Sequence, residues 1–316
     1  MAELLEHPTT STSTSQRHWL GESTNEVTGS LADLAPLVPT FDRVPFGTNP
    51  RLDMIVRRAA AKGEIPVPAG VVSKKYVLVQ HTSVIAALES ALRSADVEPL
   101  DLRSRLTMSE SGARMAMRVE LPERFAFNAP DKHPMALTFE CFNSVDRTVP
   151  LFALVGWFRL VCTNGLIIGT THASMRQNHR PPLRIADLEP VLADGLAAAA
   201  HDRALLTKSM ARPVSAPALR RWVDGPVAMM WGPFAATRVH NIVISGFDGQ
   251  PNRTPKGAPP HARGMANLKI VPGADAPCEN AYGLAQALAW VAARRKEVAE
   301  QTAWRAQIPA LMEQLE

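Results

Sequence analysis

The segment from Arg103 to Leu121 alternates apolar and polar residues with a period of two, and this constrains the fold more than any other stretch of the chain. For the apolar residues to share one face of an antiparallel hairpin, the numbers of opposed residues must add up to an odd value. A two-residue turn at Ser111-Gly112 meets this condition and predicts a β-hairpin. The apolar residues on that face are Leu106, Met108, Met115, Met117, Val119 and Leu121.

The other face of the predicted hairpin carries four arginines: Arg103, Arg105, Arg114 and Arg118. The register places Arg105 opposite Arg118, and opposed like charges destabilise a sheet unless an anion or solvent lies over them. Two alternatives follow. The face is either a solvated polar surface, with Glu120 opposite Arg103, or a surface that binds an anion.

The two segments that follow, 135–143 and 149–162, are apolar on both faces, as is typical of central strands covered on both sides. The polar connection NSVDRT lies between them, and Asn164-Gly165 predicts a further hairpin turn with 166–168 as its return strand. The segment 102–169 is therefore expected to form an antiparallel meander of about five strands.

Helical patterns flank this meander. A strand near 71–81 precedes an amphipathic helix that buries Val84, Ile85, Leu88 and Leu92. Further helices are expected over 187–210, after Ser215, and from a cap at Asn280 through residue 304. The fold class is thus α+β, with an antiparallel meander, flanking helices and a helical C-terminal part.

The predicted domain organisation is simple. Residues 1–40 are rich in Ser, Thr and Glu and short of large apolar groups, so we expect a disordered tail. Residues 41–316 are expected to form a single α+β domain. Within it we predict a sheet core over about 71–170, a helical part over about 183–316, and a mobile loop over the proline-rich stretch 248–266.

Composition favours a folded intracellular protein. The 316 residues are 46% apolar, and the longest apolar run, 149–158, is far shorter than the roughly 20 residues of a membrane helix. The N-terminus lacks the apolar segment of a secretory signal. The three cysteines, Cys141, Cys162 and Cys278, form no CxxC pair and no disulfide framework. These features favour a cytoplasmic location without a membrane partner.

A search for catalytic motifs gives no phosphate-binding loop, dinucleotide fingerprint, zinc-protease motif or nucleophile elbow. His172 and His179 are seven residues apart, which is not a pattern of metal ligands. Cys162 with His172 is a weak candidate for nucleophilic catalysis, and Glu140 with Asp146 for a nuclease pair, because each has a more ordinary structural explanation. We therefore predict no catalytic residue, no metal and no cofactor.

Basic residues are the strongest functional signal. A loop after the predicted sheet carries further cations, and Arg159 interrupts an apolar strand. Together with a net charge of +4, these positions predict contacts with phosphate groups. The predicted nucleic-acid-binding residues are Arg103, Arg105, Arg114, Arg118, Arg159, Arg176, His179 and Arg180.

Five segments over roughly 40–300 resemble the phage/plasmid-like proteins, a family of unknown function from mobile genetic elements. They are SKKYVLVQHTSV (73–84), GARMAMRVEL (112–121), FNSVDRTVPL (142–151), RLVCTNGL (159–166) and NAYGLAQALAW (280–290). The resemblance implies a role in recombination, replication or antagonism of host defence. The predicted strand meander of this chain is also similar in outline to the fold of single-strand annealing proteins, which is an analogy of fold alone.

The sequence thus favours a non-enzymatic nucleic-acid-binding protein, with single-stranded DNA preferred and annealing in recombination as its task. The alternative is a protein-interaction module that inhibits or joins a host-defence or replication complex. The expected partners are nucleic acid, a host or mobile-element protein, or further copies of the chain. An enzyme with a site near Arg159, Cys162 and His172 is the third and weakest hypothesis.

Overall fold

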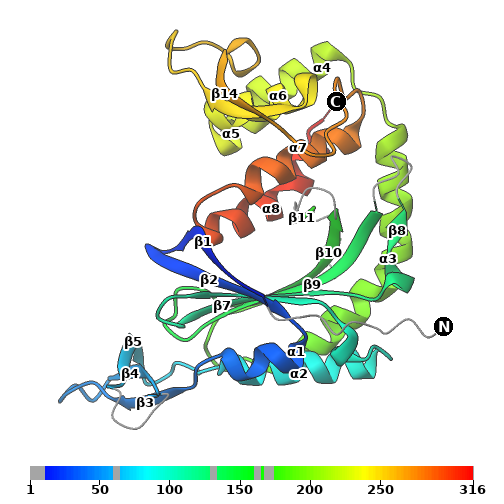
Figure 1. The fold of residues 1–316 in the computed structure, drawn as a ribbon. Coiled ribbons are helices and arrows are strands. Elements are labelled where there is room, and N and C mark those ends of the chain that lie inside the picture. The colour runs from blue at the N-terminus through cyan, green and yellow to red at the C-terminus, as the bar shows by residue number, and fades with distance from the viewer. Residues whose placement is uncertain (1–10, 60–64, 129–133, 160–164, 167–173, 316) are drawn as a thin grey trace.

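A curled antiparallel sheet is the main element of the computed structural model, which describes residues 11–59, 65–128, 134–159, 165–166 and 174–315 (Figure 1). Seven strands follow the order β1-β2-β6-β7-β9-β10-β11, and β8 and β12 pair with β9 and β10. These strands are β1 (Ser11–Trp19), β2 (Glu22–Gly29), β6 (Ser104–Ser109), β7 (Arg114–Glu120), β8 (Phe127–Asn128), β9 (Pro134–Ser144), β10 (Leu151–Arg159), β11 (Gly165–Leu166) and β12 (Ser174–Gln177).

The predicted meander is confirmed and is larger than expected. Strands β6, β7, β9, β10 and β11 are neighbours in chain order, as the sequence indicates. In the predicted hairpin, Arg105 pairs with Arg118 and Met108 with Met115, so opposed numbers add up to an odd value and the turn is centred on Ser111-Gly112. Gly112 has a φ of +75°, a conformation that favours glycine.

The N-terminal region corrects the predicted disordered tail. Of residues 1–40, those in 11–40 form β1, β2, the short helix α1 (Leu31–Leu34) and a turn of 3₁₀ helix. Strand β2 pairs with β6 and β1 pairs with β2, which extends the meander at one edge. Polar β-branched residues can form strands when a neighbour supplies the hydrogen bonds, and composition alone does not reveal that neighbour.

The predicted turn at Asn164-Gly165 is wrong. Gly165 lies in the ladder opposite Phe158, and Leu166 lies opposite Trp157. A turn centred on Asn164-Gly165 would instead place Gly165 in the loop. The remaining return strand expected at 167–168 lies outside the described residues.

The helices largely follow the predictions. Helix α2 (His81–Ser94) and α3 (Leu188–Ala211) match the amphipathic segments, and α4 (Ala216–Trp222) is capped by the Ser215 side chain. The expected final long helix is instead two helices, α7 (Ala281–Ala293), capped by Asn280, and α8 (Val298–Glu313). Two further helices are α5 (Ala228–Trp231) and α6 (Pro233–Ser245).

The proline-rich stretch predicted as a mobile loop over 248–266 is bounded by paired strands. Strands β13 (Phe247–Pro251) and β14 (Met265–Ile270) form a two-stranded sheet at the C-terminal part of the protein. A second small sheet joins β3 (Phe41–Pro45), β4 (Leu52–Arg57) and β5 (Val67–Ser73). The strand expected near 71–81 therefore starts and ends earlier.

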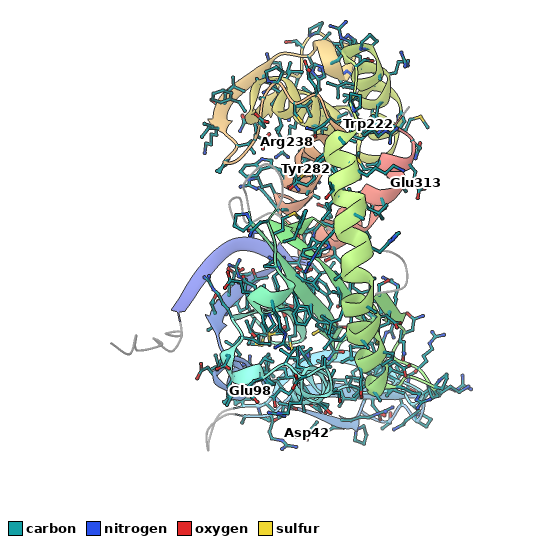
Figure 2. The ribbon with its side chains drawn as sticks, turned by 90° about the vertical axis from the view of Figure 1, so that its right-hand side faces the viewer. Asp42, Glu98, Trp222, Arg238, Tyr282 and Glu313 are labelled. Atoms are coloured by element: carbon teal, nitrogen blue, oxygen red, sulfur yellow. The ribbon has the colours of Figure 1, made fainter. Side chains whose placement is uncertain are left out.

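The helices cover the two faces of the curled sheet differently. Helices α1 and α2 lie beneath one face and α7 and α8 lie on the concave side (Figure 1), while α3 runs along the sheet to the C-terminal helices (Figure 2). Gly195 lets α3 approach β10 closely, because a Cβ there would lie 2.4 Å from Val155 Cβ. The apolar hairpin face packs toward α2, which leaves the arginine face on the concave side.

Candidate functional site

The predicted arginine face exists, but most of its charge is neutralised within the protein. On β6, Arg105 lies 3.3 Å from Glu26 of β2, between Nη1 and Oε1. On β7, Arg118 donates through Nε to Glu140 of β9. Carboxylates of neighbouring strands thus offset the opposed charges of these two arginines, a contribution that neither alternative drawn from the sequence included.

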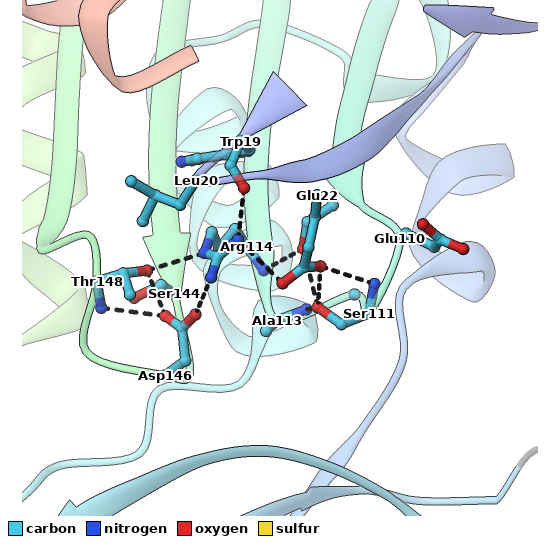
Figure 3. A network of polar contacts seen from close by, with 12 residues as sticks. Trp19, Leu20, Glu22, Glu110, Ser111, Ala113, Arg114, Ser144, Asp146 and Thr148 are labelled. Atoms are coloured by element: carbon cyan, nitrogen blue, oxygen red, sulfur yellow. Dashed lines mark hydrogen bonds and ion pairs between the residues drawn. The ribbon is translucent and has the colours of Figure 1, made fainter. Parts of the chain in front are cut away.

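Arg114 is a buried structural centre rather than a phosphate contact (Figure 3). Its guanidinium donates to the Trp19 carbonyl oxygen at 2.6 Å and lies 3.1 Å from Glu22 and 2.9 Å from Asp146. Its Nε donates to the Thr148 hydroxyl at 3.0 Å. The residue thus ties the N-terminal hairpin to the connection between β9 and β10.

A second buried network surrounds Glu140, whose side chain is 3% exposed. Arg118 reaches it from the sheet, and Arg305 reaches it from α8 with an Nη1 to Oε2 distance of 2.9 Å. Burial alone would raise the pKa of Glu140, but the positive charges of the two arginines outweigh burial and bring it from 4.5 down to about 2. The network therefore holds α8 over the concave face.

Glu140 is expected to stabilise the fold above about pH 4.5 and to lose this contribution as the pH falls toward 2, because its lowered pKa means that acid protonates the paired carboxylate. The free energy of unfolding of wild type and of Glu140→Gln should therefore differ most at neutral pH and converge on acidification. Urea denaturation over the acidic range in which both proteins stay folded measures this difference. A difference independent of pH would contradict the buried ion pair.

The structure brings together three of the predicted binding residues at one end of the sheet. Arg176, His179 and Arg180 line a cavity of about 480 Å³, and Arg147, from the connection between β9 and β10, completes its basic rim. The three arginines are exposed. Within the part of the chain that the structure describes, no carboxylate lies within ion-pair distance of any of them. We call this the basic pocket; its other lining residues are Ser73, Tyr76, Thr148, Pro150 and Asn178.

His179 forms part of the pocket wall in its neutral state. Its ring stacks on Tyr76 at 5.1 Å between centroids, and Nδ1 lies 3.2 Å from the Val77 carbonyl oxygen. Burial lowers the pKa of His179 from its ordinary value of 6.5. Tyr76 in turn donates its hydroxyl to the Ser144 carbonyl oxygen at 3.0 Å. His179 thus lies in the pocket wall against Tyr76, and the exposed positive charge of the pocket comes from the arginines.

The remaining predicted residues lie apart from this pocket or outside the described residues. Arg103 is exposed beside β6. The backbone of Arg159 ends β10 opposite Met135, and its side chain lies outside the described residues, as do Cys162 and His172. Glu140 and Asp146 are held by different arginines, so they do not form the carboxylate pair that a nuclease needs.

An apolar cavity of about 400 Å³ adjoins the basic pocket and shares Thr148, Pro150 and Arg176 with it. Three aromatic side chains, Trp19, Phe142 and Phe152, form its sheet side. Sequence reasoning missed these rings because Trp19 lies in the expected tail and the two phenylalanines look like ordinary core residues. It also missed Arg147, whose φ of +70° marks an unusual turn that the sequence does not announce.

No group of three or more His, Cys, Asp or Glu side chains in the described residues is arranged to hold a metal ion. None of the described helices is long and apolar enough to cross a bilayer. Burial raises the pKa of the Cys141 thiol to about 12, so this cysteine is a thiol at neutral pH.

Residues 68–186 match the family described as Domain of unknown function (DUF932). The matched segment includes the strands from β6 to β12 and every arginine of the basic pocket. No curated protein and no solved structure matches the chain. The segment 68–186 is therefore similar to an uncharacterised domain family, and this likeness assigns no activity.

Proposed function

We propose that the protein binds nucleic acid without catalysis, with single-stranded DNA as its preferred ligand and annealing in recombination on a plasmid or phage as its task. The observation that carries the proposal is the basic pocket, where Arg147, Arg176 and Arg180 converge on one cavity. Planar guanidinium groups bind phosphate oxygens with two parallel hydrogen bonds. Their exposure leaves them accessible to a ligand from solution.

The neighbouring aromatic rings support the preference for a single strand. Bases in a duplex are stacked and paired, whereas the bases of a single strand can turn toward aromatic side chains. The cavity with Phe142 and Phe152 adjoins the basic pocket through Arg176. Phosphate groups and bases of one strand thus have neighbouring places on the protein.

Binding of a short labelled oligothymidine is expected to weaken steeply with salt, because each neutralised phosphate of a single strand contributes a slope of about −0.7 to a plot of log affinity against log salt. Contacts from the three pocket arginines predict a slope of about −2. Fluorescence anisotropy over a series of salt concentrations measures it, with a duplex of equal length for comparison. Absence of binding at low salt would remove the proposal.

A second candidate function is a protein-interaction module that inhibits or joins a host complex. Exposed apolar side chains of the C-terminal part favour it: Met229 is 85% exposed, and Ile270 is 71% exposed opposite Phe247 in the two-stranded sheet. Exposed apolar groups that gather on a surface are typical of protein interfaces. Recovery of one stoichiometric host protein, free of nucleic acid, on immobilised protein would favour this candidate.

A further inference from the structure

The apolar cavity beside the basic pocket lies between the concave face of the sheet and one side of α8. Its helix side consists of Ala299, Thr302, Ala303 and Ala306, which recur at the spacing of a single helix face. All four side chains are small. The helix therefore leaves open a volume of about 400 Å³ opposite the aromatic rings of the sheet.

The aromatic side of the cavity is organised by the strand register. Phe142 on β9 pairs with Phe152 on β10, and their ring centroids are 5.7 Å apart. Trp19, at the end of β1, meets Phe142 edge to face with centroids 6.5 Å apart. Trp19 and Phe142 are buried and hold Phe152 in place, and Phe152 is the ring of the three that is partly exposed toward α8.

Arg176 links this surface to the basic pocket. It lies directly opposite Phe152 in the ladder between β10 and β12, so both side chains are on the same face of the sheet. Arg176 lines both cavities. A nucleotide has the matching arrangement, since its anionic phosphate and its aromatic base are separated by one sugar.

Trp19, one of the residues that line the cavity, carries a buried polar donor. Trp19 is 1% exposed, and among the described residues its indole Nε1 has no hydrogen-bond partner. A buried donor without a partner costs free energy, and a ligand with a suitable acceptor removes this cost. The carbonyl oxygens and ring nitrogens of nucleobases are such acceptors.

We propose that the cavity receives one unstacked nucleobase of the bound strand while Arg176 binds the adjoining phosphate. The inference rests on the proposed function and makes it more specific. It requires that affinity depend on the presence of bases and not on phosphates alone. It also requires that a larger side chain on the side of α8 that lines the cavity abolish the dependence of affinity on bases.

The test compares a labelled oligothymidine with an abasic strand of the same length, by fluorescence anisotropy at low salt. Loss of stacking on an aromatic surface predicts roughly 10-fold weaker binding of the abasic strand to the wild type. Ala303→Leu is expected to narrow the cavity between α8 and Phe152 and bring the oligothymidine down to the affinity of the abasic strand. Ala310→Leu is the matched control, because Ala310 is exposed on the same helix and does not line the cavity.

The outcomes distinguish a failure of the base cavity from a failure of nucleic-acid binding as a whole. Equal affinities of the wild type for both strands would overturn the base cavity and leave phosphate binding intact. A base dependence that survives in Ala303→Leu would also overturn it. Failure of both strands to bind the wild type would instead overturn the proposed function. Equal melting temperatures of Ala303→Leu and Ala310→Leu establish that a difference in folding does not cause a difference in binding.

Discussion

Replacing Glu140 by leucine is expected to lower the free energy of unfolding by about 3–5 kcal/mol, because it leaves two arginines buried without their carboxylate. The side chains of Arg118 and Arg305 are only 20% and 8% exposed, so water replaces the lost carboxylate only in part. Urea denaturation at neutral pH measures the loss. A cost below about 1 kcal/mol would show that both arginines reach solvent in the variant.

The matched rescue replaces the whole network. A triple variant with leucine at Glu140 and methionine at Arg118 and Arg305 removes the carboxylate and both arginines together, and apolar replacement of a buried ion network is often neutral or stabilising. We expect its stability to return close to that of the wild type. Asp275→Asn serves as the control for losing a carboxylate, since Asp275 is exposed, and it is expected to change stability by less than about 0.5 kcal/mol.

Reversing two charges of the basic pocket, Arg176→Glu with Arg180→Glu, is expected to weaken oligothymidine binding by about 100-fold or more at low salt. A hydrogen bond to a charged group contributes about 1.5–3 kcal/mol, and two such bonds are lost while repulsion is added. Both arginines are exposed and have no carboxylate partner among the described residues, so the melting temperature should stay nearly unchanged. Fluorescence anisotropy measures the affinity for oligothymidine, and thermal unfolding of the same preparation measures the melting temperature.

The control for this double variant carries the same change of net charge elsewhere. Arg253 and Lys256 are exposed in the connection between β13 and β14, at the C-terminal part of the protein. Reversing both to Glu should leave the affinity within a few-fold of wild type. Equal losses in the two double variants would mean that net charge, and not the basic pocket, governs binding. Arg114 is unsuited to such a test, because its reversal would break the buried ion network of Figure 3.

Local patterning predicted the central hairpin well. The alternation over 103–121 predicted the two strands, because side chains of a strand alternate between its faces. The turn at Ser111-Gly112 then determined which residues are opposed, including Arg105 and Arg118. Helical periodicity gave α2 and α3 for the same reason. Such features depend on residues close in the sequence, and the structure adds little to them.

The neighbours of the arginines could not be predicted in this way. Glu22 lies 92 residues before Arg114, and Arg305 follows Glu140 by 165 residues. Which carboxylate meets which arginine depends on strand order and on the placement of α8, and neither leaves a local pattern. The same holds for the basic pocket, where Arg147 joins Arg176 and Arg180 because β12 pairs with the start of β10, next to the connection that carries Arg147.

The closure of the N-terminal hairpin against α8 has a consequence for the order of folding. The Leu20 amide donates to Glu297 at 2.6 Å across a separation of 277 residues, and the His18 amide donates to the Lys296 carbonyl oxygen at 2.9 Å. Contacts between such distant segments form late, because a long loop must close first. A growing chain therefore has its strands before it has the enclosure of Trp19 by α8. The proposed base cavity is therefore complete only when both ends of the fold have met.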